Sequence, residues 1–254
     1  MLNKEKIVNE LNDLGVKPPK IVFYDLTDST NTRAREYAKA NPQEKETVVF
    51  IANGQTAGRG RLGRSFVSEE GAGIYLTLLT YPDSSGVDAT AATTRAAICL
   101  ARAIESVCDC DIKIKWVNDL YLGGKKLAGI LTEGEMGENG KIAYQIIGMG
   151  INVYKTAISD GISAIATSLE AQCNCVPDRS VLAARIIAQL LSFHGDCYSE
   201  YKSRSFIIGK KVTVIKLAES YEAEVVDINP DFSLTVEHKG MTERLFTGEI
   251  SLKI

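Results

Sequence analysis

The chain has 254 residues, with 29 lysines and arginines against 32 aspartates and glutamates, so its net charge is −3. Hydrophobic residues make up 45% and charged residues 24%, which is ordinary for a soluble globular protein and excludes an intrinsically disordered chain. The charge balance also argues against a protein that coats DNA, because such proteins are strongly basic. With only two histidines, a histidine-rich metal centre is excluded.

Targeting signals and disulfides are not expected. The amino terminus lacks the apolar core of a signal peptide, and the best apolar run, residues 182–193, is interrupted by polar residues and too short to span a bilayer. We therefore expect a cytoplasmic protein that does not enter a membrane, with its six cysteines as free thiols. Two pairs, Cys108 with Cys110 and Cys173 with Cys175, leave a four-thiolate zinc site open, although C-x-C is not the usual zinc spacing.

Up to Ser205 the chain alternates predicted helices and strands. Helices are predicted within residues 1–20 and over residues 32–40, 89–107 and 179–201, the last being the longest. Strands are predicted over residues 21–24, 47–52, 73–80, 112–116, 119–122, 125–132 and 142–147. Residues 47–52 are apolar almost throughout, so we expect that strand to be buried on both faces. Gly123 and Gly124 between two strand-like runs predict a two-residue hairpin turn.

After Ser205 the pattern changes to short strands joined by turns. These strands are predicted over residues 212–215, 223–228, 232–237 and 244–246. About fifty residues of this kind are typical of a small antiparallel β-barrel. We therefore expect an α+β fold in two domains. Residues 1–204 would form a mixed β-sheet with helices, and residues 205–254 the small barrel.

The most unusual segment is residues 53–66 (NGQTAGRGRLGRSF), here called the glycine–arginine loop, with four glycines and three arginines. Glycine permits close approach to a ligand, and arginine offers permanently charged, planar donors that suit phosphate and carboxylate. Gly58, Gly60 and Gly63 match a dinucleotide-binding fingerprint, but a loop-like stretch follows instead of the helix that this fingerprint requires. A solvated basic loop and a nucleic-acid contact are alternatives. We favour a lid that becomes ordered over an anionic ligand.

A second polar segment, residues 115–119 (KWVND), contains the only tryptophan. Trp116 on its own is more often part of a core than a stacking platform, and Asn118 with Asp119 could simply form a turn. Together they could place an amide and a carboxylate beside a nucleotide, since Mg²⁺ is commonly held by one carboxylate and substrate phosphates. Lys126, which follows the hairpin turn, could lie at the surface or point inward and reach an anion.

Taken together, these segments make the chain resemble the biotin–protein ligases, from about residue 20 to its end. Five motifs occur in that family's order: residues 28–31 (DSTN), 55–64 (QTAGRGRLGR), 115–119 (KWVND), 126–131 (KLAGIL) and 148–152 (GMGIN). Residues 248–252 (GEISL) look like the family's end. The resemblance implies a mixed sheet related to class II aminoacyl-tRNA synthetases, followed by a small barrel. The family often has proline where Val117 stands and tryptophan where Phe66 stands.

The reaction that the resemblance implies has two halves and no protein nucleophile. The carboxylate of biotin attacks the α-phosphate of ATP, which gives biotinyl-5′-AMP and pyrophosphate. A lysine amine of a biotin carboxyl carrier protein then attacks this mixed anhydride and releases AMP. Carboxylate and triphosphate repel each other by roughly 4 kcal/mol at about 4 Å and an effective dielectric constant of 20, so cations must be held where they meet. Arg59, Arg61, Lys126 and Mg²⁺ would offset this repulsion.

The resemblance also assigns residues to each ligand. The biotin site would be lined by Ser29, Thr30, Asn31, Gln55, Arg59, Gly60, Arg61 and Lys126. The residues facing ATP would be Arg61, Phe66, Trp116, Asn118, Asp119 and Asn152. Arg61 and Lys126 would be catalytic, and Asp119 would hold the metal together with substrate phosphates.

Other functions remain open at this point. A lipoate- or octanoate-transferring ligase is the nearest alternative, but lipoate has no urea ring for Ser29 and Gln55 to bind. A non-catalytic sensor of biotin or nucleotide would have no use for Lys126 and Arg61 together. An RNA-binding module is disfavoured by the net charge of −3. We expect a carrier protein as partner and no sequence-specific DNA, since only about twenty residues precede the first predicted strand, fewer than a DNA-reading module needs. A homodimer is left open.

Overall fold

The structure is a computed structural model that describes residues 2–82, 89–137, 141–174, 176–216, 220–246 and 249–252. Cys175, from one of the C-x-C pairs, and Gly248, from the final motif, lie outside these residues. The other cysteines are free thiols, as expected.

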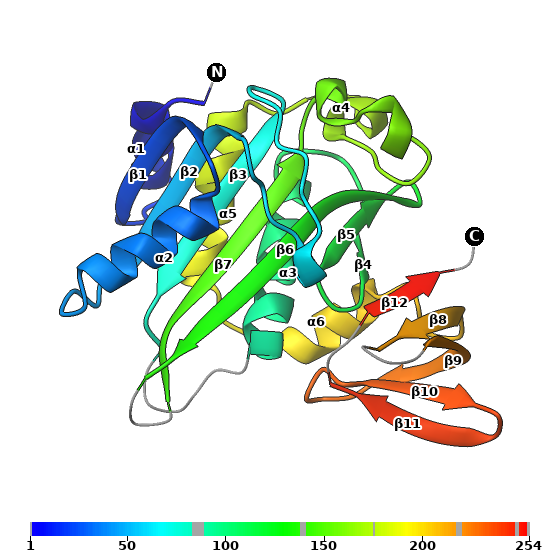
Figure 1. Ribbon diagram of the computed structural model, residues 1–254. Helices are drawn as coiled ribbons and strands as arrows, with labels where there is room; N and C mark the ends of the chain where they lie inside the picture. The colour runs from blue at the N-terminus through cyan, green and yellow to red at the C-terminus, as the bar shows by residue number, and fades with distance from the viewer. Residues whose placement is uncertain are drawn as a thin grey trace.

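A seven-stranded mixed sheet crosses the centre of the molecule in the order β1-β2-β3-β7-β6-β5-β4 (Figure 1). Its strands are β1 (Lys20–Thr27), β2 (Val48–Gln55), β3 (Gly73–Thr80), β4 (Lys113–Lys115), β5 (Asp119–Leu122), β6 (Lys125–Met136) and β7 (Ile142–Asn152). The pair β1–β2 is parallel and every other neighbouring pair is antiparallel. The first seven residues of β2 are buried, which confirms the prediction that both faces of this strand are covered. Gly123 and Gly124 make the predicted hairpin turn with φ of +58° and +76°.

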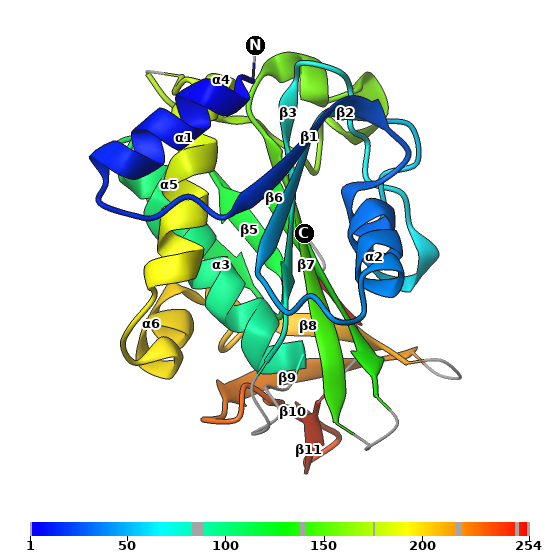
Figure 2. The same ribbon diagram turned by 90° about the vertical axis from the view of Figure 1, so that its left-hand side faces the viewer.

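Helices cover both faces of this sheet. They are α1 (Lys4–Asp13), α2 (Thr30–Ala40), α3 (Ala89–Glu105), α4 (Leu169–Gln172), α5 (Arg179–Ser192) and α6 (Cys197–Arg204). Figure 2 shows α1, α3 and α5 on one face of the sheet and α2 on the other. The apolar core lies mainly between the sheet and α3, whose residues from Ala96 to Ala101 are all at most 1% exposed. On the other face, Ala34 and Ala38 of α2 pack in a smaller apolar cluster with sheet residues such as Phe50.

The single long helix predicted over residues 179–201 is wrong. The chain forms α5 and α6 instead, and α3 with 17 residues is longer than either. The break follows from two residues that the apolar pattern hides: Gly195 has a φ of +130°, and the carboxylate of Asp196 accepts hydrogen bonds from the backbone N–H groups of Tyr198 and Ser199. A side chain that caps a new helix in this way competes with continuation of the old one.

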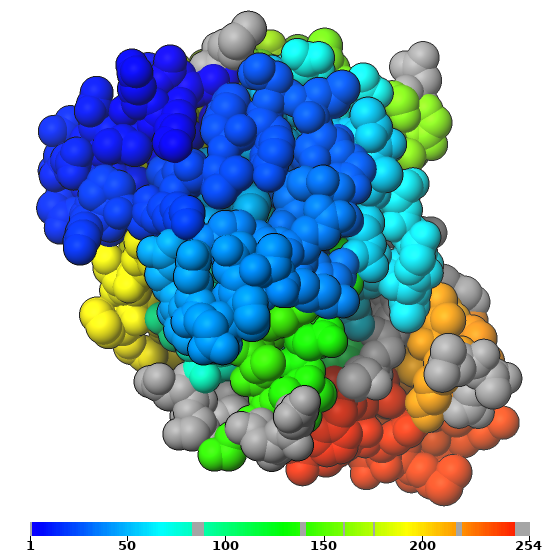
Figure 3. Space-filling model, turned by 60° about the vertical axis from the view of Figure 1, so that its left-hand side comes forward, coloured from blue at the N-terminus to red at the C-terminus, as the bar shows by residue number. Residues whose placement is uncertain are grey.

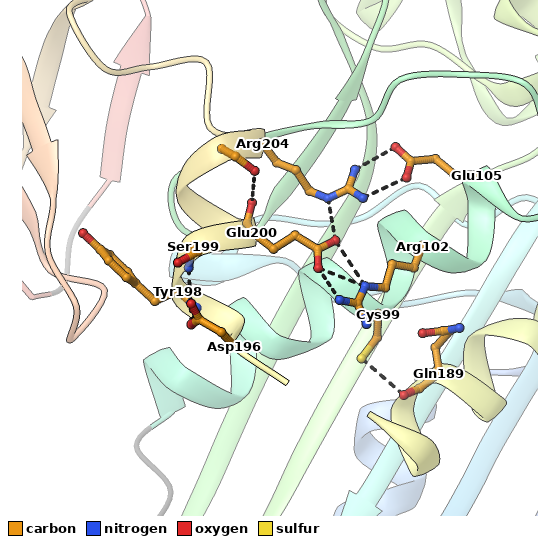
Figure 4. A network of polar contacts seen from close by, with 10 residues as sticks. Cys99, Arg102, Glu105, Gln189, Asp196, Tyr198, Ser199, Glu200 and Arg204 are labelled. Carbon is orange, nitrogen blue, oxygen red and sulfur yellow. Dashed lines mark hydrogen bonds and ion pairs between the residues drawn. The ribbon is translucent and has the colours of Figure 1, made fainter. Parts of the chain in front are cut away.

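Helices α3 and α6 are joined by ion pairs (Figure 4). Glu200 of α6 lies between Arg102 of α3 and Arg204 of its own helix, whose Nε is 3.0 Å from Glu200 Oε1. Arg204 also makes a bidentate pair with Glu105 of α3, at 2.7 and 2.8 Å. Burial alone would raise the pKa of Glu200, but the two guanidinium groups outweigh it and hold that pKa below its ordinary value.

No helix of the described residues is long and apolar enough to cross a membrane.

A second, antiparallel sheet follows α6. Its strands are β8 (Lys211–Ile215), β9 (Ser220–Ile228), β10 (Leu234–His238), β11 (Met241–Leu245) and β12 (Glu249–Leu252), in the order β11-β10-β9-β8-β12. The antiparallel sheet is as predicted, with β12 as an additional strand. Within the described residues the edge strands β11 and β12 do not pair, so the sheet is not closed into the predicted barrel. The buried indole of Trp116 donates to the carbonyl of Phe232 at 2.8 Å and so connects this sheet to the larger one. The domain boundary between residues 204 and 205 stays a prediction.

Candidate functional site

A cavity of about 940 Å³, counting its open mouth, lies between the start of α2, the glycine–arginine loop and strands β5 to β7. Five segments that are far apart in the sequence meet there. Every site residue predicted from the sequence lines this cavity except Asn152. Figure 3 shows the loop (cyan) at the surface beside α2 (blue), and Figure 2 places both on the same face of the sheet.

The first turn of α2 supplies the polar end of the cavity. Ser29, Thr30 and Asn31 are only 3–4% exposed. The backbone N–H and the hydroxyl of Thr30 both donate to Gln55 Oε1, at 2.8 and 3.1 Å. Thr77 Oγ1 on β3, fully buried, is 2.7 Å from both Thr30 Oγ1 and Asn31 Oδ1. These side chains therefore occupy fixed positions, as recognition of a neutral polar group requires.

Two glycines of β7 make room for this arrangement. A Cβ at Gly148 would lie 2.0 Å from Asn31 Oδ1, and one at Gly150 would lie 2.5 Å from the ring of Phe66. Neither position tolerates a side chain while the opposite residue stays in place. The alternating glycines of the 148–152 motif are thus explained by what lies over them: an amide of α2 and the aromatic ring that ends the glycine–arginine loop.

The glycine–arginine loop is a tight turn folded over the sheet. The N–H of Gly60 donates to the carbonyl of Arg64 at 2.7 Å, and that of Phe66 donates to the carbonyl of Gly58 at 2.9 Å. Leu62 and Gly63, at the tip, have φ of +55° and +75°. At the base, a Cβ on Gly58 would lie 2.3 Å from the carbonyl oxygen of Phe66, so this position requires glycine.

The cations of the cavity are held by neighbouring acceptors. Lys126 Nζ on β6 is 2.6 Å from Asp119 Oδ1 on β5, across the hairpin. Arg61 donates to Asn118 Oδ1 at 3.0 Å, and the Asn118 amide in turn donates to the carbonyl of Ile130 at 2.9 Å. The Asp119 side chain is 18% exposed and the Lys126 side chain 36%, so both can reach a ligand. These contacts aim two positive groups at one region of the cavity.

The residues present fit Mg²⁺ only as a shared site. Among the described residues, no group of three or more histidine, cysteine, aspartate or glutamate side chains could hold a metal by itself. Asp119 offers one carboxylate in the lining of the cavity, and its Oδ1 already pairs with Lys126. One carboxylate completed by substrate phosphates and water is the usual environment of Mg²⁺.

Two predicted ATP residues are more buried than a ligand contact requires. Trp116 is 3% exposed, and its ring N–H is used by Phe232, so only a small part of it faces the cavity. Asn152 does not reach the cavity. Its amide donates to the carbonyl of Thr167 at 3.1 Å, and Thr167 N–H donates to the carbonyl of Lys126 at 2.8 Å. Asn152 is therefore connected to the backbone of Lys126 through Thr167.

Three residues that do not line the cavity hold its lining residues in place and were not predicted from the sequence: Thr77, Ser68 and Glu133. Ser68 Oγ accepts from the amide of Gln55 at 2.9 Å, and Glu133 Oε2 accepts from the amide of Asn31 at 3.0 Å. A threonine inside the apolar run of residues 73–80 was the one available signal, because a buried hydroxyl needs a hydrogen-bond partner.

Comparison with known proteins agrees with this geometry. Residues 23–152 match the Biotin/lipoate A/B protein ligase family. The chain belongs to this family. It is 30% identical over 246 residues to the bifunctional ligase/repressor BirA of Bacillus subtilis, covering 91% of this chain and 74% of that protein. It is also 30% identical over 236 residues to the biotin–[acetyl-CoA-carboxylase] ligase of Mycobacterium tuberculosis, covering 88% of this chain and 85% of the relative.

The fold is shared with solved structures of the same family. The biotin protein ligase from Aquifex aeolicus, in complex with biotin and ATP, superposes with a TM-score of 0.75 at 24% sequence identity. That alignment covers 92% of this chain and 98% of the other. The fold of this chain is therefore one that a solved structure shares over nearly the whole of both chains.

Proposed function

We propose that this member of the family is a biotin–protein ligase, which activates biotin with ATP to biotinyl-5′-AMP and transfers the biotin to a lysine of a biotin carboxyl carrier protein. The observation that carries the proposal is the convergence of five separate motifs on one cavity that has a polar, uncharged end and a cationic side. Such a cavity suits a ligand with a neutral ring system at one end and a carboxylate at the other, joined to a phosphate.

Biotin would lie with its ureido group at the start of α2. Ser29, Thr30 and Gln55 offer hydroxyl and amide groups there, and a urea has both donors and acceptors for them. Arg59 and Gly60 of the loop would cover the bound ring system. The carboxylate of the valeryl chain would then reach toward Lys126.

The two anions would meet between Arg61 and Lys126. Repulsion between carboxylate and phosphate, roughly 4 kcal/mol at about 4 Å and an effective dielectric constant of 20, is offset by positive groups already in place. A biotin carboxylate oxygen forms the bond to the α-phosphorus while the bond to pyrophosphate breaks. Asp119 would hold Mg²⁺ together with the phosphates, and the metal would further neutralise their charge.

The mixed anhydride must survive until the carrier arrives. The glycine–arginine loop, with Phe66 at its end, lies over the cavity and would exclude water from the intermediate. Phe66 and the exposed part of Trp116 would contact the nucleotide. In the second half-reaction the neutral amine of the carrier lysine attacks the acyl carbon, an amide forms and AMP leaves.

Biotin is favoured over lipoate because the curated relatives named above are biotin ligases or BirA proteins. Titration calorimetry with biotin and with lipoate separates the two, since only a biotin ligase binds biotin more tightly. A non-catalytic sensor would bind biotin and ATP without releasing pyrophosphate. Release of pyrophosphate that requires both substrates excludes this alternative.

Location and assembly are proposals of the same kind. We place the protein in the cytoplasm, where its carrier and ATP would be found, and expect no sequence-specific DNA binding from a chain of net charge −3. A gel shift that persists in excess competitor DNA would contradict the second point. Sedimentation with and without biotin and ATP tests whether a homodimer forms.

The decisive experiment is transfer of labelled biotin to a purified carrier domain. Label should become covalently attached only when ATP is present, and only when the carrier keeps its acceptor lysine. A carrier with arginine at that position is the matched control. Absence of transfer from an enzyme that is folded and binds biotin would refute the proposal.

A further inference from the structure

Glu133 on β6 is the acceptor for three nitrogen groups from two other elements. Arg59 of the glycine–arginine loop places Nη2 3.1 Å from Oε1 and donates from Nη1 to Oε2 at 3.3 Å. Arg35 of α2 places Nη2 2.7 Å from Oε1. The amide of Asn31, at the start of α2, donates to Oε2 at 3.0 Å. One carboxylate thus joins β6, α2 and the loop.

The carboxylate lies in a partly buried position, with Arg35 beside it and the more exposed Arg59 reaching it from the loop. The Glu133 side chain is 22% exposed, and those of Arg35 and Arg59 are 26% and 43% exposed. Solvent screens such a partly buried cluster less than it screens an exposed pair. Removing the carboxylate would also leave two guanidinium groups facing each other without an anion between them.

The other end of the loop is anchored to the same network. Ser68 Oγ donates to the carbonyl of Phe66 at 3.0 Å and accepts from Gln55 Nε2, while Gln55 Oε1 accepts from Thr30. Thr30 connects through the hydroxyl of Thr77 to Asn31, whose amide ends on Glu133. The entry and the exit of the loop are therefore both tied to the first turn of α2.

We propose that Glu133 is a positioning residue that holds the glycine–arginine loop closed through Arg59 and fixes the Asn31 amide at the polar end of the cavity. The closed position of the loop is inferred from the contacts alone. The consequence, retention of the acyl-adenylate, rests on the proposed function. Glu133 itself acts through the other residues. Without it, the loop would open more often and water would reach the anhydride.

The test compares Glu133→Gln with Glu135→Gln. Glu135 lies two residues along the same strand and is exposed, so its substitution makes the same change of charge on the same face. Trypsin cleavage after Arg61 and Arg64, which all variants retain, reports opening of the loop without any substrate. We expect cleavage to be at least several-fold faster in Glu133→Gln than in the wild type, and unchanged in Glu135→Gln.

The second readout is the lifetime of enzyme-bound biotinyl-5′-AMP in the absence of carrier. It should fall about tenfold in Glu133→Gln, a loss of about 1.4 kcal/mol in retention, and remain as in the wild type in Glu135→Gln. If Glu133 acts on the loop through Arg59, trypsin should cleave the double variant Arg59→Gln/Glu133→Gln after Arg61 and Arg64 no faster than it cleaves Arg59→Gln alone.

Each outcome has one meaning. Equal loop cleavage in a folded Glu133→Gln overturns the inference. If Glu133→Gln is cleaved faster but the wild-type protein forms no adenylate, the inference about the loop stands and the proposed function is refuted. Should Glu133→Gln fail to fold, Arg59→Gln breaks the same contact from the loop side, while Arg35 keeps its pair with Glu133. Faster trypsin cleavage of Arg59→Gln after Arg61 and Arg64 then supports the inference, and cleavage at the wild-type rate overturns it.

Discussion

Replacement of Gly148 by alanine should disturb the polar end of the cavity more than any other change of one carbon atom on β7. The added Cβ would lie 2.0 Å from Oδ1, 2.8 Å from Cγ and 2.9 Å from Nδ2 of Asn31. Ordinary carbon contacts begin near 3.4 Å, so the amide would have to retreat by more than an ångström. It could not do so without leaving the partners that hold it.

The cost follows from those partners. Asn31 would lose its contact with Thr77 Oγ1 at 2.7 Å and its hydrogen bond to Glu133 Oε2 at 3.0 Å. A neutral hydrogen bond contributes about 1 kcal/mol and one to a charged group about 1.5–3 kcal/mol. Alanine in a strand regains roughly 0.5–1 kcal/mol over glycine. We therefore expect the free energy of unfolding to fall by about 2–3 kcal/mol, and the affinity for biotin to fall with it.

Urea unfolding of a double-mutant cycle checks this reasoning. In the Asn31→Ala background the amide is absent, so Gly148→Ala should cost almost nothing. The matched control is Gly134→Ala on β6, where a Cβ would meet Ile142 and Tyr144 no closer than 3.9 Å, and where no loss is expected. The explanation fails if Gly148→Ala is as harmless as Gly134→Ala, or if its cost is the same with and without Asn31.

Two further predictions concern the cations and the α3–α6 contact. Lys126→Ala and Arg61→Ala should each slow adenylate formation at least about 100-fold, as expected for loss of one transition-state contact, whereas the control Lys125→Ala should not. The rate of pyrophosphate release measures adenylate formation, and unchanged rates would exclude both residues from the mechanism. Glu200→Gln should lower stability at about pH 7, because a carboxyl whose folded pKa is depressed stabilises the fold above its unfolded pKa of about 4.3. That contribution disappears as the pH falls through the folded-state pKa, which the two guanidinium groups hold below its ordinary value. The difference between variant and wild type should therefore shrink as the pH is lowered below about 4.3 in urea unfolding, and a difference independent of pH would contradict the assigned ion pairs.

The parts of the fold that could be predicted from the sequence are those that local pattern determines. Continuous apolar residues over 47–52 and the pair Gly123-Gly124 specify a buried strand and a hairpin whatever surrounds them. The helix break near Gly195 was missed because apolar residues continue up to Phe193. In the sequence, Gly195 and the capping residue Asp196 are a weaker signal than that apolar pattern.

The site divides in the same way. The motifs correctly predicted which residues line the cavity, with the exception of Asn152. Asn152 instead bonds to Thr167, and local sequence pattern does not encode that contact. Thr77 and Glu133 were missed for a related reason. Thr77 lies on β3 and Glu133 on β6. Their partners, Asn31 for Thr77 and Arg59 for Glu133, come from elements that only the folded sheet places beside them.

Charge balance explains why two carboxylates, Asp119 in the cavity and Glu133 behind its lining residues, matter as much as the cations. Arg59, Arg61 and Lys126 would repel one another in a partly buried cavity if no anion were near. Glu133 pairs with the first and Asp119 with the last, so the cations keep their positions before substrates arrive. Incoming carboxylate and phosphate groups then add anions to a framework that is already folded, and little energy is spent on rearranging it. On this argument Asp119→Asn should misplace Lys126 as well as weaken Mg²⁺ binding, so excess Mg²⁺ should restore adenylate formation only in part; full recovery would limit Asp119 to the metal.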